Sequence, residues 1–252
     1  MPALLDTVDP DGLLEYSVVF TDRSLNHMSV KFQSVMRDIS SILKEVYAAD
    51  AVALVPGGGT YAMEAVARQI AVNKRVMVLR NGWFSYRWSQ IFEAGSIPSS
   101  EVVLKARRSG NGPKAAFAPM QIDEVVTKIS ADQPDVVFAP HVETSSGIIL
   151  PDDYLKAISD AVHSYGGLFV LDCIASGCAW VNMRATGVDF IISAPQKGWS
   201  ASPSAGMVMM SQAGLTAVKT SQSNSFSVDL GKWLSIMAVS YTHLTLPTNL
   251  RV

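Results

Sequence analysis

Two short apolar runs, each ended by a polar residue, most constrain how this chain can fold. Residues 168–171 form the first run, which stops at Asp172. Residues 190–192 form the second, which stops at Ser193, and Lys197 follows four residues later. Apolar runs of this length, bounded by glycine-rich and polar segments, predict buried strands. Open α/β sheets carry their chemistry at the carboxyl ends of the strands, so an aspartate and a lysine are expected at one edge of a sheet.

Similar runs recur along the chain and alternate with helical patterns. From Ser29 to Tyr47 the apolar residues lie three, four and one positions apart, which predicts one buried face of an amphipathic helix. Strands are expected at residues 51–55, 76–79, 102–104, 135–139, 168–171, 190–192 and 207–210, and further helices at 61–72, 122–129 and from 151 to about 166. The segments 105–114 and 141–147 are expected to be loops. This alternation predicts an α/β fold, a three-layer sandwich with a mainly parallel central sheet.

Composition excludes several classes of protein. With 252 residues and 48% hydrophobic content, the chain can bury a sizeable core. A net charge of −2 makes no electrostatic case for binding nucleic acid or a membrane surface, and no apolar run is long enough to cross a bilayer. The acidic N-terminus lacks the pattern of a secretory signal. Cys173 and Cys178 do not match a disulfide framework, so free thiols and a cytoplasmic location are expected; the four histidines have no metal-ligand spacing.

The segment Pro56–Thr60, with the sequence PGGGT, lies between a predicted strand and a predicted helix. Glycines allow the backbone to approach an anion, and a helix N-terminus offers unpaired N–H groups and a partial positive charge, so this arrangement favours a phosphate site. It is neither GxGxxG nor a Walker loop, and a plain strand-to-helix turn is an equally good interpretation.

Asp172 and Lys197 together point to a cofactor. A lone lysine is usually a solvated surface residue, but Lys197 lies in a Gly/Ser/Pro-rich loop after a buried strand. Pyridoxal 5′-phosphate (PLP) requires a lysine that holds its aldehyde as a Schiff base and an acid that keeps its pyridine nitrogen protonated.

Five segments, in order and spacing, resemble the class V, fold-type I PLP-dependent aminotransferases of the alanine/serine–glyoxylate group. The resemblance spans roughly residues 20–237. The matching segments are PGGGTYAMEAVAR (56–68), RNGWFSYRW (80–88), HVETSSGIILP (141–151), LFVLDCIASG (168–177) and ISAPQKGWSASP (192–203). Any one segment is weak evidence, whereas five in register are specific for the fold and the cofactor, and less so for the substrate.

The resemblance implies two catalytic residues. Lys197 would hold the cofactor and then move the proton between Cα of the substrate and C4′ of the cofactor. Asp172 would pair with the pyridine nitrogen. A lysine in this role is expected to be shielded from solvent.

The resemblance also assigns the residues that bind the cofactor. Phe84 would stack on one face of the ring, Ile174 would pack against the other, and Thr144 would hydrogen-bond near the ring hydroxyl. The phosphate would be held by Gly58, Gly59 and Thr60, with help from Gln196. The resemblance implies no metal.

The domain organisation follows from the same comparison. We expect an N-terminal arm at residues 1–28 and a PLP-binding large domain at residues 29–238. Residues 239–252 resemble a translated sequencing adapter, so we expect a non-native tail and no small C-terminal domain. That domain would carry the arginine that binds the substrate carboxylate, and the intact parent would be a homodimer.

The function implied is amino transfer between a small amino acid, of the alanine or serine type, and a 2-oxo acid such as glyoxylate or pyruvate, impaired in a truncated chain. A 2-aminoethylphosphonate transaminase is an alternative. A cysteine desulfurase-like lyase is weaker, because Gln196 and not histidine precedes Lys197. A non-catalytic anion-binding α/β module, in which PGGGT binds phosphate, is the alternative outside enzymes.

Overall fold

The computed structural model describes residues 30–238; the predicted arm and tail lie outside the described residues. The helices are α1 (Val30–Tyr47), α2 (Gly59–Ile70), α3 (Trp83–Gly95), α4 (Ile122–Asp132), α5 (Asp152–His163), α6 (Met183–Thr186), α7 (Gln212–Thr220) and α8 (Leu230–Ala238). The strands are β1 (Ala51–Pro56), β2 (Arg75–Arg80), β3 (Ser100–Lys105), β4 (Arg107–Arg108), β5 (Phe117–Ala118), β6 (Val136–Pro140), β7 (Val142–Glu143), β8 (Ile148–Ile149), β9 (Leu168–Asp172), β10 (Phe190–Ser193) and β11 (Ala205–Met210).

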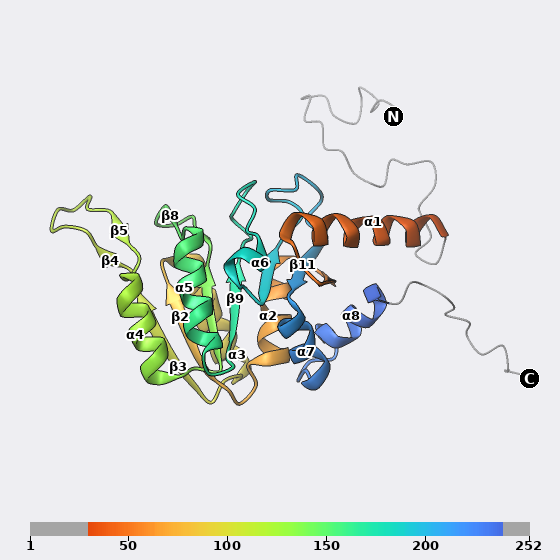
Figure 1. Cartoon of the computed structure of the whole chain (residues 1–252). Coiled ribbons are helices and arrows are strands. Elements are labelled where there is room, and N and C mark those ends of the chain that lie inside the picture. The colour runs from red at the N-terminus through yellow and green to blue at the C-terminus, as the bar shows by residue number, and fades with distance from the viewer. Residues whose placement is uncertain (1–29, 239–252) are drawn as a thin grey trace, which may run out of the picture.

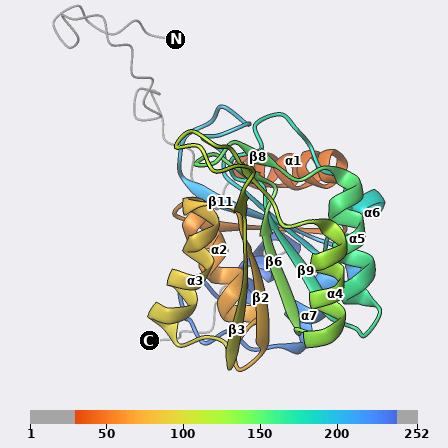
Figure 2. The same cartoon turned by 90° about the vertical axis from the view of Figure 1, so that its left-hand side faces the viewer.

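A seven-stranded sheet in the order β1-β11-β10-β9-β6-β2-β3 forms the middle layer (Figures 1 and 2). Neighbouring strands from β10 to β3 run parallel, and β11 runs antiparallel to both β1 and β10. The predicted mainly parallel sheet is therefore confirmed. All strands of the sheet except β11 have their carboxyl ends at the same edge.

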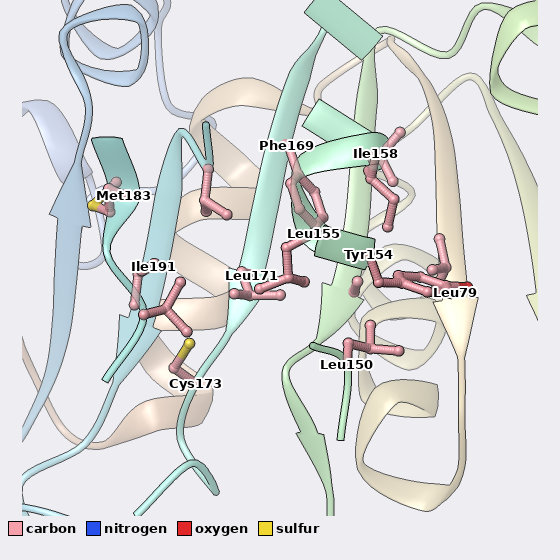
Figure 3. Packing of buried hydrophobic residues seen from close by; sticks show 14 of the residues in the cluster. Leu79, Leu150, Tyr154, Leu155, Ile158, Phe169, Leu171, Cys173, Met183 and Ile191 are labelled. Carbon is pink, nitrogen blue, oxygen red and sulfur yellow. The ribbon is translucent and has the colours of Figure 1, made fainter. Parts of the chain in front are cut away.

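Both faces of the sheet are buried, because side chains alternate along each strand. On β9, Phe169 and Leu171 pack with Leu155 and Ile158 of α5 (Figure 3), whereas Val170 packs on the opposite face. Helices α1, α4, α5 and α6 contribute to the first core, and α2, α3, α7 and α8 to the second. The three-layer sandwich is thus confirmed.

Two segments predicted as loops contain short hairpins instead. The basic segment after β3 forms the β4–β5 pair, in which Arg107 pairs with Ala118. The segment after β6 forms the β7–β8 pair, in which Glu143 pairs with Ile148. Two-residue strands leave too short a sequence pattern to predict. Within residues 30–238, Cys173 and Cys178 are free thiols as predicted, and no helix is long and apolar enough to cross a membrane.

Candidate functional site

Three segments from different strands meet at the carboxyl edge of the sheet. Helix α2 begins directly after β1 and crosses β11 so closely that a Cβ atom at Gly206 would collide with Ala62. This crossing brings the first turn of α2 to the ends of the two central strands: a Cβ at Gly59 would collide with Ile174 and lie 3.4 Å from Ala194. Ile174 follows β9 and Ala194 follows β10. The PGGGT segment, the Asp172 segment and the Lys197 segment are therefore in contact.

Asp172 is a buried carboxylate at the end of β9. It pairs in register with Ile192 of β10, and its Oδ1 accepts a 2.9 Å hydrogen bond from the Ile174 N–H. Burial raises the pKa of Asp172 to about 6, and the nearby Arg87 only partly offsets this effect. A group that carries a positive charge would lower the pKa again, which is the chemistry expected of a pyridinium partner.

We predict that Asp172→Asn stabilises the cofactor-free chain at neutral pH. The pKa is higher in the folded chain, about 6, than the ordinary value of 3.8, so the folded state binds the proton more tightly. Below pH 4 the protonated group contributes up to about 3 kcal/mol to the free energy of unfolding, and this contribution is lost as pH rises through 6. Urea unfolding of both proteins at pH 4 and pH 7 measures this difference.

The matched control is Asp132→Asn, because Asp132 is an exposed aspartate at the end of α4. That variant should keep the pH dependence of the wild-type chain. If Asp172→Asn also keeps it, Asp172 is not a destabilising charge. With PLP present the wild-type chain should be more stable than Asp172→Asn, because the asparagine variant has lost the negative charge that would hold the ring nitrogen.

Lys197 lies in a tight turn after β10. Its N–H donates to Ala194 O at 3.3 Å, and its own carbonyl accepts from the Ser200 N–H at 3.2 Å. The neighbouring Gly198 packs so closely on the backbone of Gly177 that a Cβ there would collide with it. The loop that follows Asp172 and the turn that contains Lys197 are thus packed on each other. The expectation that Lys197 is shielded is wrong for this structure: both Gln196 and Lys197 are exposed, because no described segment covers the turn.

The N-terminus of α2 is open for an anion. Gly58 occupies the N-cap position with no side-chain cap, and a Cβ there would meet nothing within 4 Å. Thr60 is exposed in the first turn. A helix N-terminus without a capping side chain, with free space beside Gly58, meets a geometric requirement for holding a phosphate.

A second part of the site forms around Glu143, whose role the sequence did not reveal. Glu143 is fully buried, and each carboxylate oxygen accepts several hydrogen bonds. The backbone N–H groups of Phe84 and Ser85, in the first turn of α3, donate at 3.1 and 2.8 Å. The hydroxyls of Ser85 and Ser145 donate at 2.7 and 2.6 Å. Glu143 therefore joins the start of α3 to the β7–β8 turn.

This carboxylate positions two of the predicted cofactor-binding residues. Phe84 lies in the helix turn that Glu143 holds and is 37% exposed, and Thr144 is the next residue after Glu143 and is exposed. Burial acts to raise the pKa of Glu143, but the hydrogen bonds from Ser145, Ser85 and Phe84 outweigh it, so the pKa lies below its ordinary value. Its charge also acts on Asp172, which connects the two parts of the site electrostatically.

His141 is a further buried polar residue that the sequence did not single out. The backbone N–H of His141 donates to the backbone carbonyl of Asp172 at 2.8 Å. The ring nitrogen Nδ1 of His141 lies 2.7 Å from Ser176 Oγ. Burial lowers the pKa of His141, so a neutral ring is favoured. The signal available was the HVETSSG segment itself, in which a histidine and a glutamate directly follow a buried strand.

The residues present fit PLP. Asp172 offers a buried carboxylate whose charge Arg87 compensates only in part, α2 offers an open anion site, and Phe84 offers a partly exposed ring. Ile174 lies between Asp172 and the start of α2. No cluster of histidine, cysteine, aspartate or glutamate suited to a metal ion occurs among residues 30–238.

Known proteins similar to this chain include several transaminases. An Anabaena cylindrica protein named soluble hydrogenase 42 kDa subunit is 28% identical over 90% of this chain and 58% of its own length. An L-aspartate–glyoxylate aminotransferase of Paracoccus denitrificans is 26% identical over 79% of this chain and 49% of its own. A 2-aminoethylphosphonate–pyruvate transaminase of Vibrio vulnificus is 28% identical over 75% of this chain and 48% of its own length.

The fold is also that of a solved aminotransferase. The crystal structure of an alanine–glyoxylate aminotransferase from Nostoc sp. has a TM-score of 0.74 at 23% identity, covering 88% of this chain and 57% of that one. The chain thus spans about half the length of the relatives it matches. The family model for class-V aminotransferases matches residues 12–230. Because this match spans most of the chain, the protein belongs to the class V aminotransferase family.

Proposed function

We propose that this protein takes part in PLP-dependent amino transfer between a small amino acid, of the alanine or serine type, and a 2-oxo acid such as glyoxylate or pyruvate. The observation that carries the proposal is the contact between Gly59, Ile174 and Ala194. It brings an open helix N-terminus, a buried carboxylate and a lysine-bearing turn to one place. These are the three groups needed to hold the phosphate, the ring nitrogen and the aldehyde of PLP.

Each group has a chemical role in the proposal. When bound, PLP supplies an aldehyde that captures an amino group and a ring that accepts the electron pair left at Cα. Asp172, as a carboxylate, holds the proton on the ring nitrogen. Lys197, as a free amine, takes the proton from Cα of the donor. The bound cofactor would supply the carrier for the amino group between the two 2-oxo acids, and Lys197 would move the proton between Cα and C4′.

The family relationship supports the reaction type more strongly than the substrate pair. Relatives named for aspartate and glyoxylate, and for 2-aminoethylphosphonate and pyruvate, match with similar identity. We therefore keep 2-aminoethylphosphonate as a second candidate donor. The proposal includes a homodimer, which rests on the family resemblance alone.

A half-reaction screen tests the proposal. The chain is loaded with PLP and mixed separately with alanine, serine, aspartate, 2-aminoethylphosphonate or cysteine, and the absorbance of the lysine-bound cofactor is followed. We expect alanine or serine to remove this absorbance and release the matching 2-oxo acid at a reduced rate, since amino transfer is expected to be impaired in this chain. If 2-aminoethylphosphonate removes the absorbance and the other amino compounds do not, the second candidate donor is favoured. Release of sulfide from cysteine, with no amino transfer, would contradict a transaminase.

A further inference from the structure

An open surface cavity lies outside the set of residues predicted to bind the cofactor. It has a volume of about 260 Å³ and is located where β2 and β3 end. Arg80 and Lys105, the last residues of the two strands, line it together with Asn81. In the sheet β2 is two strands and β3 three strands away from β9, which carries Asp172. At the usual spacing of strands these distances are roughly 10 and 14 Å.

The cavity holds two positive charges side by side. Arg80 and Lys105 are paired in the parallel register of β2 and β3, and the Ala106 N–H donates to Arg80 O at 3.1 Å, which fixes the two strand ends to each other. The Arg80 guanidinium lies 3.8 Å from the centroid of the Tyr86 ring. Within residues 30–238, neither Arg80 nor Lys105 forms an ion pair with a carboxylate. Two adjacent cations repel each other, and an anion between them would remove that repulsion.

Asn81 supplies an independent indication of a ligand. Its side chain is 4% exposed, yet its Nδ2 has no hydrogen-bond partner in the described part of the chain. A buried amide donor without an acceptor costs free energy, and such groups are uncommon in folded proteins. The Glu143 side chain lies against Gly82, the residue after Asn81. Its carboxylate oxygens already accept hydrogen bonds from the start of α3 and from Ser145. Asn81 lines the cavity, and no acceptor for its Nδ2 lies among the described residues, so an anion bound there offers one.

The rim of the cavity is aromatic. Trp83 and Phe117 line it and are 63% and 43% exposed, respectively. Exposed rings beside a cationic cavity suit the apolar part of a small organic anion. None of these residues belongs to the set predicted to hold PLP.

We propose that this cavity is a second anion site, which binds a small molecule through a carboxylate or phosphate group. Arg80 and Lys105 supply the charge, Asn81 Nδ2 donates one hydrogen bond to the oxyanion, and Trp83 and Phe117 pack against the remainder of the ligand. The site is distinct from the N-terminus of α2 and does not depend on the proposed function.

Side-chain NMR tests this site directly. The ¹⁵N-labelled chain is titrated with inorganic phosphate, and separately with succinate, at constant ionic strength, while the Asn81 side-chain amide signal is followed. We expect a saturable shift with phosphate, with succinate or with both, and the active probe identifies the group bound. Lys105→Met, an exposed change at the sheet edge, should weaken the response about tenfold or more. Arg80→Lys, which keeps the charge but not the planar guanidinium, should weaken it less.

The matched control is Lys74→Met, which removes the same charge at the opposite edge of the sheet, where Lys74 is exposed. Its response should stay within about twofold of the wild-type chain, because surface charges at this distance are largely screened. The titration is run with and without PLP. The anion site can then be tested even if the chain does not bind PLP. No saturable shift of Asn81 with either anion, or equal weakening by Lys74→Met, would overturn the proposal.

Discussion

Replacing Lys197 by methionine is expected to abolish retention of PLP by this chain. The proposed attachment is a covalent bond to the lysine amine, and methionine has a similar length without a nucleophile. Loss of the nucleophile and proton carrier should lower any amino-transfer rate at least about 10⁴-fold. Retention is measured as the absorbance of lysine-bound cofactor after gel filtration. Because Lys197 is exposed in its turn, the variant should keep the stability of the wild-type chain.

Two control variants make this result specific. Lys197→Arg keeps the positive charge and should also lose the covalent bond, since a guanidinium stays protonated near neutral pH. Lys219→Met removes a lysine from the last turn of α7 and should retain the cofactor fully. If Lys197→Met retains the cofactor absorbance while Lys219→Met loses it, the attachment point has been assigned to the wrong residue.

The second large effect is expected at Glu143. Glu143→Ala removes the acceptor for the backbone N–H groups of Phe84 and Ser85 and leaves a cavity in a fully buried position. Each orphaned buried donor costs about 1–3 kcal/mol, so we expect the free energy of unfolding to fall by about 3–5 kcal/mol. Urea denaturation at pH 7 measures this change. Cofactor affinity should fall with it, because the turn that carries Phe84 is no longer held.

The pH dependence of this stabilisation has a defined sign. The folded pKa of Glu143 lies below its ordinary value, so its contribution is present above the ordinary pKa of 4.5 and is lost as pH falls through the folded pKa. Glu143→Gln keeps the shape of the side chain but turns an NH₂ group toward hydrogen-bond donors. Its loss of stability should therefore be smaller than that of Glu143→Ala. Thr144→Ala changes the exposed neighbour and should alter stability by less than about 0.5 kcal/mol. An equal loss in the Thr144 and Glu143 variants would contradict a specific role for the carboxylate.

The sequence predicted the fold well because the signals for it are local. Apolar runs such as residues 168–171 and 190–192 identify buried strands without knowledge of their neighbours. Their alternation with helices then favours a parallel sheet, in which Asp172 and the turn before Lys197 must end at the same edge. The structure confirms this arrangement through the pairing of Ile192 with Asp172.

Features that depend on contacts between distant segments were not predictable. Glu143 meets the N-terminus of α3 across 58 and 59 residues of sequence, and nothing near Glu143 in the chain indicates the donors from Phe84 and Ser85. The pairing of Arg80 with Lys105 likewise depends on the register of two strands. Solvent exposure of Lys197 could not be predicted, because shielding depends on which segments pack over the turn.

Borohydride trapping tests directly whether PLP attaches to Lys197, as proposed, in the site formed with Asp172 and α2. The chain is incubated with PLP, reduced with sodium borohydride, digested and analysed by mass spectrometry. We expect about one phosphopyridoxyl group per chain, located on the peptide that contains Lys197, and a strong loss of this label in Asp172→Asn. Label spread evenly over exposed lysines such as Lys74 and Lys114, with none enriched at Lys197, would contradict the proposed attachment.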